Sequence, residues 1–343
     1  MSGAFPEDTS ALDAWAKTHV EGWRGPSAVE KFPTGQSNPT YRIDAPSGRY
    51  VLRRKPPGKL LKMAHMIERE FRVLKALEGV GYPAPRALAL CEDESVIGTA
   101  FYLMAFVEGR VLWDPALPEL EREDRAKIYD AMNAGLARLH SIDVAAAGLS
   151  DYGKPGGYFA RQYQRWTDQY RASETARIED MERLIAWLAD KVPAADDGRV
   201  ALVHGDWRID NMIFDLKSPR LLAVLDWELS TLGHPLADLA YQCMQWRLPN
   251  GRYRGLGGVD RAAKGIPTEA EYVAAYCKRM GLEAIPNWTF LIAFSFFRSI
   301  AIHQGVYKRS LDGNASNPEL ARQVGESVPF VAHIAWEGVE AAA

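Results

Sequence analysis

The 343-residue sequence is poor in cysteine, in long apolar runs and in charge of one sign. Its three cysteines, Cys91, Cys243 and Cys277, lie far apart and form no CxxC pair, so neither a zinc knuckle nor a disulfide framework is predicted. We expect all three to be reduced, buried thiols. The longest apolar stretch, Phe290 to Phe297, has eight residues, whereas a membrane span needs about 20.

The charge balance and the first residues narrow the class of protein further. A formal net charge of −3 gives no overall basic field, which disfavours nucleic acid as the main partner. The N-terminus carries Glu7, Asp8 and Asp13 without an apolar segment, which is not typical of a secretory signal. We therefore expect a cytoplasmic protein that binds neither nucleic acid nor a membrane, as a monomer or a homodimer.

The hydrophobic pattern of the chain changes near residue 108. Short runs separated by turn residues predict strands in the first 110 residues, and Met63 to Leu77 has helical spacing. Beyond this point the spacing is mostly helical. We therefore predict an α+β fold of two lobes: a β-rich N-terminal lobe over residues 1–108, which ends in a hinge, and a larger helical C-terminal lobe over residues 109–343.

The predicted elements are short in the first lobe and long in the second. The strands expected in the first lobe are Ala28–Pro33, Thr40–Asp44, Arg49–Arg54, Ala87–Leu90 and Thr99–Phe106. The second lobe is expected to contain strands at Val200–His204, Met212–Leu216 and Leu221–Leu225, and helices at Arg122–His140, Tyr158–Tyr170, Pro235–Trp246, Thr268–Met280 and Trp288–Tyr307, with another near Met181 to Leu188.

Two short polar segments carry the chemistry. Asp206 follows a predicted strand, Asn211 comes five residues later, and Asp226 and Glu228 end the next predicted hairpin. Phosphoryl transfer needs a carboxylate that orients and deprotonates the acceptor hydroxyl, together with oxygen ligands for magnesium. We assign Asp206 as the catalytic base, Asn211 as a catalytic residue that also holds metal, and Asp226 and Glu228 as further metal ligands.

The pattern HGDxxxxN followed by DxE resembles the aminoglycoside phosphotransferase and choline kinase group, which shares the protein kinase-like fold. The resemblance covers nearly the whole chain and implies ATP and Mg²⁺ as cofactors and a small-molecule hydroxyl acceptor. It also implies a nucleotide loop, a phosphate-gripping strand residue with a partner on a helix, and an adenine-contacting hinge. The residues so implied are Gly35, Ser37, Asn38, Val51, Arg53, Glu70, Met104, Phe106 and Val107.

The chain departs from the family pattern at one position and from protein kinases at another. Arg53 stands where the family has a phosphate-gripping lysine, and Lys55 is the alternative for that role. Arginine binds phosphate oxygens well, but its reach and shape differ from those of lysine. Glu228 stands where protein kinases have glycine, so it is interpreted either as a metal ligand or as a structural residue.

Within this group the chain most resembles the kinase-like domains associated with acyl-CoA dehydrogenases. The runs that carry this resemblance are Tyr50 to Pro56, Asp226 to Gly233 and Gly265 to Thr268. It implies a hydroxyacyl-CoA or a related metabolite as the acceptor. The candidate acceptor-binding residues are Arg208, Arg298, Tyr307 and Arg309, although a solvated helix face explains those beyond Arg208 equally well.

Three other functions stay open at this point. An antibiotic kinase of the aminoglycoside type is the second choice, because such acceptors are polycations and favour an acidic pocket. A catalytically silent pseudokinase that only binds nucleotide is disfavoured by Asp206, Asn211 and Asp226. A hydrolase could instead hold metal with two of these aspartates and with His204 and His234, but an oxygen set with asparagine favours magnesium over zinc. No Ala-Pro-Glu segment follows Asp226, which disfavours a protein kinase.

Overall fold

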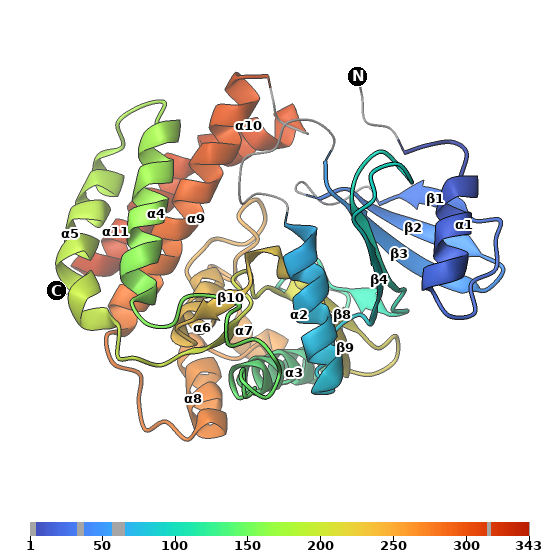
Figure 1. Ribbon diagram of the computed structural model, residues 1–343. Coiled ribbons are helices and arrows are strands. Elements are labelled where there is room, and N and C mark those ends of the chain that lie inside the picture. The colour runs from blue at the N-terminus through green and yellow to red at the C-terminus, as the bar shows by residue number, and fades with distance from the viewer. Residues whose placement is uncertain (1–4, 33–37, 57–65, 314–316, 343) are drawn as a thin grey trace. The chain divides into compact units, whose positions relative to one another are not determined.

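The computed structural model describes residues 5–32, 38–56, 66–313 and 317–342 (Figure 1). Contacts within the chain divide it into two compact units. Unit 1 consists of Met1–Arg110, Ala146–Leu149 and Met212–Leu229, and unit 2 of Val111–Ala145, Ser150–Asn211 and Ser230–Ala343. The division predicted from the sequence at residue 108 assigned the two later segments of unit 1 to the C-terminal lobe.

Unit 1 is built on a five-stranded antiparallel sheet in the order β1-β2-β3-β5-β4. The register pairs Ala45 with Gly48, so β2 and β3 form the predicted hairpin. Each strand lies within a predicted run or differs from it by one residue. The strands are β1 (Ala28–Lys31), β2 (Thr40–Ala45), β3 (Gly48–Arg54), β4 (Ala87–Cys91) and β5 (Phe101–Ala105).

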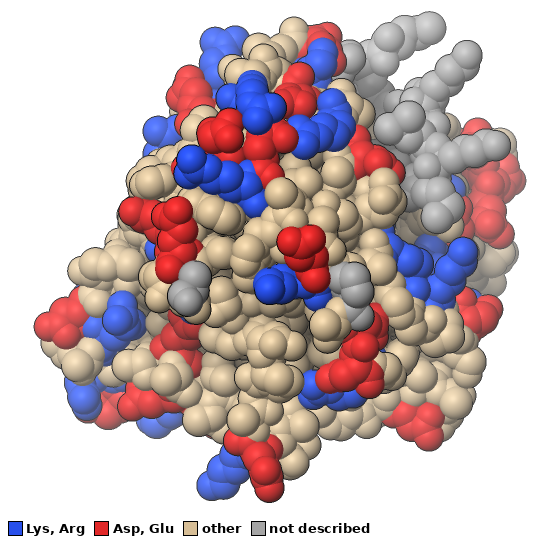
Figure 2. Space-filling model, turned by 90° about the vertical axis from the view of Figure 1, so that its left-hand side faces the viewer, with Lys and Arg blue, Asp and Glu red and all other residues tan. Residues whose placement is uncertain are grey.

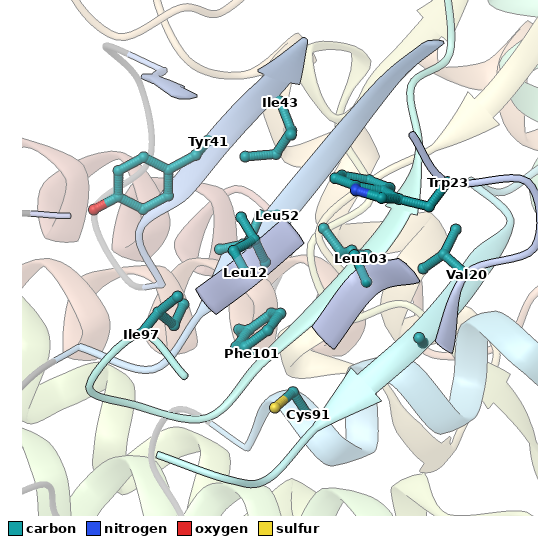
Figure 3. Close-up of a cluster of buried hydrophobic side chains, with 12 residues drawn as sticks. Leu12, Val20, Trp23, Tyr41, Ile43, Leu52, Cys91, Ile97, Phe101 and Leu103 are labelled. Atoms are coloured by element: carbon teal, nitrogen blue, oxygen red, sulfur yellow. The ribbon is translucent and has the colours of Figure 1, made fainter. Parts of the chain in front are cut away.

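One face of this sheet packs against α1 (Ser10–His19), for which the sequence analysis made no prediction. Leu12 and Ala16 are four residues apart on α1, so they lie on the same face of the helix and both are fully buried. Figure 3 shows Leu12 beside Leu52 and Phe101 from the sheet. Each such buried side chain contributes about 1.5–3 kcal/mol.

The rest of unit 1 consists of a helix and a short hairpin. The helix α2 (Ile67–Gly79) contacts β4 and β5. Its predicted start at Met63 lies outside the described residues, and it ends at Gly79, two residues beyond the predicted end at Leu77. In the hairpin of β8 (Met212–Phe214) and β9 (Leu221–Val224), Met212 pairs with Val224.

Helices make up most of the regular structure described in unit 2, which also contains the short antiparallel pair β7 (Ala201–Val203) and β10 (Thr231–Gly233). The helix α9 (Trp288–Leu311) is long and apolar enough to span a membrane by composition, but 78% of its most apolar window is buried within the protein. It contacts α4, α5, α6, α10 and α11 and so forms the centre of the unit. The other helices are α3 (Arg122–His140), α4 (Tyr158–Ser173), α5 (Glu179–Ala195), α6 (Leu236–Cys243), α7 (Arg261–Lys264), α8 (Glu269–Met280), α10 (Pro318–Glu326) and α11 (Val328–Glu340).

The described residues also include short 3₁₀ turns, the strand β6 and the three cysteines. Three 3₁₀ turns, at Ile209–Asn211, Trp227–Leu229 (η2) and Met244–Trp246, lie among the described residues, and β6 (Arg110–Val111) lies where the chain passes from unit 1 to unit 2. The three cysteines are free and buried, as predicted.

Charges of both signs are mixed on the face of the molecule shown in Figure 2. Lys and Arg side chains lie among Asp and Glu side chains there, so the described residues on this face form no extended field of one sign. Several ion pairs join neighbouring turns of one helix, such as Lys308 and Asp312 at 2.5 Å. Exposed pairs of this kind contribute about 0–1 kcal/mol each.

Gly109 is a position in unit 1 where any side chain would collide with its neighbours. A Cβ atom there would lie 2.4 Å from Ile213 Cγ2 and 2.5 Å from the backbone oxygen of Phe214. We therefore expect Gly109→Ala to lower the free energy of unfolding by about 1–3 kcal/mol, measured by urea denaturation. Gly79→Ala is the control, because a Cβ atom at Gly79 meets nothing within 4 Å. Equal stability of the two variants would contradict this prediction.

Candidate active site

The loop after β7 brings two of the predicted site residues together within unit 2. The side-chain nitrogen Nδ2 of Asn211 donates hydrogen bonds to Asp206 Oδ2 at 2.8 Å and to the backbone oxygen of Asp206 at 2.9 Å. Both hydrogen bonds use the amide nitrogen, so the amide oxygen Oδ1 is left for a metal. The asparagine therefore fixes the carboxylate of Asp206 with one end and offers a hard oxygen ligand with the other.

Asp238 at the start of α6 braces this loop. Its carboxylate accepts hydrogen bonds from the backbone nitrogens of His204 at 2.6 Å and Gly205 at 2.8 Å, and His140 Nε2 lies 3.3 Å away. Gly205 has a φ of 84°, a left-handed conformation that glycine adopts at little cost. His204 Nδ1 in turn accepts a hydrogen bond from the backbone nitrogen of Asp206 at 3.1 Å. Asp238 and His204 therefore brace this loop by hydrogen bonds to its backbone.

The electrostatic surroundings keep both buried aspartates ionised. Burial alone would raise the pKa of Asp206, but the charges of Arg208 and His204 and hydrogen bonds from Tyr241 and Asn211 hold it below its usual value. Burial would likewise raise the pKa of Asp238, yet the hydrogen bond from His140 and the nearby histidine charges lower it. Asp206 is therefore a carboxylate at neutral pH, which suits it to orient a hydroxyl group.

Arginines surround Asp206 on two sides. Arg208 Nε lies 3.6 Å from Asp206 Oδ1, and Arg208 shares the carboxylate of Asp210 with Arg254. On the other side, Arg298 is 6% exposed and donates to the backbone oxygen of Gly205 at 2.5 Å. Arg298 is thus a buried brace of the loop after β7.

Trp166 lies beside this arginine and links it to another. The guanidinium carbons of Arg165 and Arg298 lie 4.9 and 5.7 Å from the Trp166 ring centre. Arg298 is also 5.2 Å from the ring of Tyr241, whose hydroxyl hydrogen-bonds to Asp206. Cation–π contacts of this kind contribute about 0.5–2 kcal/mol each. They hold positive charge close to the proposed base.

Tyr307 and Arg309 are the other two residues predicted to bind the acceptor. Both lie further along α9 than Arg298. Tyr307 packs on Gly325 of α10 so closely that a Cβ atom there would lie 2.0 Å from the Tyr307 ring. Arg309 is exposed near the end of α9. The sequence placed His303 on the same late helix, either lining the acceptor pocket or on a solvated face; burial and the charge of Arg208 lower its pKa to about 4, against the opposing charge of Asp206. It is a neutral imidazole in the field of the loop.

The second group of site residues lies in unit 1 and centres on Arg53 of β3. Its Nε atom is 2.7 Å from Glu70 Oε2, in an ion pair whose N–H does not point straight at the oxygen. Its Nη2 atom donates to Asp226 Oδ1 at 2.7 Å and to Glu228 Oε2 at 3.2 Å. The structure therefore brings together Arg53, its predicted helix partner and two predicted metal ligands. Lys55 instead pairs with Glu68.

Glu70 is the buried centre of this group. It is 2% exposed and accepts hydrogen bonds from Asn38 Nδ2 at 2.8 Å and from the Tyr102 hydroxyl at 3.1 Å. Burial raises the pKa of Glu70, which the charge of Arg53 opposes. Asn38, predicted to bind the nucleotide, thus has a side chain that braces Glu70, and Tyr102 is a brace that the sequence analysis missed.

The remaining nucleotide-site predictions fall on the sheet and on the hinge. Val51 and Met104 are each 9% exposed. Among the described residues, the backbone groups of Phe106 and Val107 have no hydrogen bond to another backbone group, so they are available to an adenine ring. Gly35 and Ser37 lie outside the described residues.

A zinc-type hydrolase site is not supported. The structure describes no cluster of three or more His, Cys, Asp or Glu residues arranged to hold a metal. His234 Nε2 is 3.0 Å from Asp197, and the ring nitrogen Nδ1 of His204 accepts from the loop backbone. Asn211 in unit 2 and Asp226 in unit 1, the residues predicted to hold metal, each offer an oxygen donor, which suits magnesium better than zinc.

The sequence is similar to a known protein family and to curated proteins. A family model described as "Phosphotransferase enzyme family" matches residues 28–286. The chain is 50% identical over 340 residues to acyl-CoA dehydrogenase family member 10 of Mus musculus, covering 97% of this chain and 31% of that protein. It is 43% identical over 322 residues to acyl-CoA dehydrogenase family member 11 of Rattus norvegicus, covering 91% and 41%. The chain spans well under half the length of these relatives.

Solved structures show the same fold. A crystal structure from Ralstonia eutropha JMP134, provisionally described as an aminoglycoside phosphotransferase, is 48% identical with a TM-score of 0.87 and covers 98% of this chain and 99% of that one. Choline kinase from Cryptosporidium parvum is 11% identical with a TM-score of 0.64, covering 98% and 97%. The predicted α+β protein kinase-like fold is therefore confirmed.

Proposed function

Because the chain belongs to the phosphotransferase enzyme family, we propose that it is a small-molecule kinase that transfers the γ-phosphate of ATP, with magnesium, to an acceptor hydroxyl. The observation that carries the proposal is the fixed pair of Asp206 and Asn211. An ionised carboxylate with one oxygen held by an amide, on a loop anchored by Asp238, is arranged to orient a hydroxyl group and take its proton.

The residues of unit 1 supply the nucleotide side of the proposed reaction. Arg53 is a permanently charged donor for phosphate oxygens, and Glu70 holds it in place. Asn211 and Asp226 are assigned to magnesium, whose charge would neutralise the phosphates when it is bound. Glu228, the third ligand predicted from the sequence, is hydrogen-bonded to Arg53. Because the transition state is loose, positioning and charge account for most of the catalysis.

The charges near Asp206 support an anionic acceptor. The group contains four arginines and three aspartates, so positive charge exceeds negative: Arg165, Arg208, Arg254 and Arg298 against Asp206, Asp210 and Asp238. A hydroxyacyl-CoA carries phosphate groups that complement such a group. The mammalian relatives are named as members of the acyl-CoA dehydrogenase family, which supports the same class of acceptor.

An aminoglycoside is the second candidate acceptor, because the similar chain from Ralstonia eutropha carries that description. A panel of hydroxyacyl-CoAs, the corresponding free hydroxy acids and aminoglycosides, each incubated with ATP and magnesium, separates the candidates. We expect transfer to the acyl-CoA class. Transfer to aminoglycosides alone would reverse this order, and magnesium-dependent nucleotide binding without transfer to any acceptor would favour a pseudokinase.

Asp226→Asn is expected to weaken magnesium-dependent binding of the ATP analogue AMP-PNP by at least about tenfold, since it removes a charged metal ligand. Asparagine is the suitable replacement because Asp226 has a φ of 63°, which asparagine tolerates. Calorimetry with and without magnesium measures the effect. Asp130→Asn, at an exposed position on α3, is the control. Equal magnesium-dependent binding by wild type and Asp226→Asn would show that Asp226 is not a metal ligand.

A further inference from the structure

The guanidinium group of Arg53 faces three carboxylates, and these contacts use two of its three nitrogen atoms. A guanidinium has five N–H hydrogens: one on Nε and two on each terminal nitrogen. Nε faces Glu70, and the two hydrogens of Nη2 serve Asp226 and Glu228. Nη1 makes no hydrogen bond to any residue that the structure describes. Its two hydrogens are therefore the donors that remain for a ligand.

Glu228 stands on a fixed part of the backbone. It lies in η2, whose Trp227 is 2% exposed, and the indole nitrogen of Trp227 donates to the backbone oxygen of Val224 at 2.9 Å. The ring of Tyr82 contacts the indole edge-on, with the ring centres 6.0 Å apart. Because its neighbour is anchored in this way, Glu228 meets Arg53 from a defined direction.

A lysine at position 53 could not replace this arrangement. An ammonium group has three hydrogens, and the three carboxylates of Glu70, Asp226 and Glu228 would use all of them. None would remain for phosphate oxygens. An arginine at this position therefore keeps donors for phosphate oxygens beside the three acids that face it in this chain.

We propose that Glu228 is a positioning residue for Arg53, and that its carboxylate does not bind the metal. By sharing Nη2 with Asp226, Glu228 fixes the guanidinium so that Nη1 is the donor to the nucleotide phosphates. This inference rests on the proposed kinase function, because it assigns the roles of two residues within the nucleotide site of that function.

The test is a double-mutant cycle of Arg53→Lys and Glu228→Gln, followed by calorimetry of AMP-PNP binding. Arg53→Lys alone is expected to weaken nucleotide binding by at least about tenfold. Adding Glu228→Gln removes one of the competing charges and frees the ammonium, so the double variant should recover several-fold of the loss. Glu228→Gln alone should change the apparent magnesium affinity by less than about threefold, whereas Asp226→Asn should change it by more than about tenfold.

Two results would overturn the inference. One is a double variant that binds no more tightly than Arg53→Lys. The other is a Glu228→Gln variant that needs as much extra magnesium as Asp226→Asn, which would make Glu228 a metal ligand. Thermal unfolding of every variant, followed without nucleotide, separates a loss of binding from a loss of folding.

A matched control lies in the same sheet. Arg42 also bridges two acids, with Nη2 at 2.8 Å from Glu30 and Nε at 2.8 Å from Asp44, but it is 39% exposed. The cycle of Arg42→Lys and Glu30→Gln is expected to leave nucleotide binding unchanged. Wild-type protein that binds no nucleotide would refute the proposed function and this inference with it, whereas normal wild-type binding without rescue would refute the inference alone.

Discussion

Asp206→Asn is expected to lower kcat by about 10²–10⁴-fold while nucleotide affinity stays within about threefold of wild type. The substitution keeps the shape of the side chain and its contact with Asn211 Nδ2 through the remaining oxygen. It removes the negative charge that orients the acceptor hydroxyl and takes up its proton. Single-turnover kinetics with a saturating acceptor, together with calorimetry of AMP-PNP, measures the two quantities separately.

The control for this experiment is Asp168→Asn, an exposed aspartate on α4. Wild-type kcat in Asp206→Asn would remove this residue from the role of base. A parallel fall in nucleotide affinity and melting temperature would show instead that Asp206 serves mainly to fold the loop.

Asp238→Ala is expected to have the largest effect on stability, a loss of about 2–5 kcal/mol in the free energy of unfolding. The reason is that the backbone nitrogens of His204 and Gly205 would lose their acceptor inside the protein. Urea denaturation measures the change. An unfolding midpoint equal to that of wild type would contradict the assignment of Asp238 as the anchor of the loop.

The same residue gives a pH dependence of defined sign. The pKa of Asp238 is lowered in the folded protein, so its stabilisation is fully present above the unfolded pKa of about 3.9. It is lost as the pH falls through the folded pKa, because protonation then favours the unfolded chain. The free energy of unfolding of wild type should therefore decrease on acidification more steeply than that of Asp238→Asn. Parallel curves would assign the acid sensitivity to other carboxylates.

The strands and most helices could be predicted because their signals are local. β2, β3 and the long apolar face of α9 follow from periodicity and turn residues alone. α10 gave no such signal, because its buried positions are the small residues Ala321 and Gly325, which admit the ring of Tyr307. Packing that depends on a small residue leaves little trace in a hydrophobic pattern.

The candidate site was predictable in its motifs and not in its long-range contacts. Asp206 and Asn211 are five residues apart, so their spacing predicted the contact that the structure contains. Arg298 reaches the carbonyl of Gly205 across 93 residues of sequence, and no local pattern marks that hydrogen bond. The sharing of Nη2 of Arg53 between two acids is likewise a property of side-chain direction, which spacing alone does not specify.

The packing of α1 has a consequence for the definition of the domain. The family model matches residues 28–286, but Leu12 and Ala16 are fully buried in the core of unit 1, and α11 buries Val331 and Ala332 in unit 2. A fragment trimmed to the matched residues would lose these layers and expose the apolar surfaces beneath them. The segment that the family model matches is therefore smaller than the segment that folds, and the boundaries of a stable fragment should follow the hydrophobic core rather than the ends of that match.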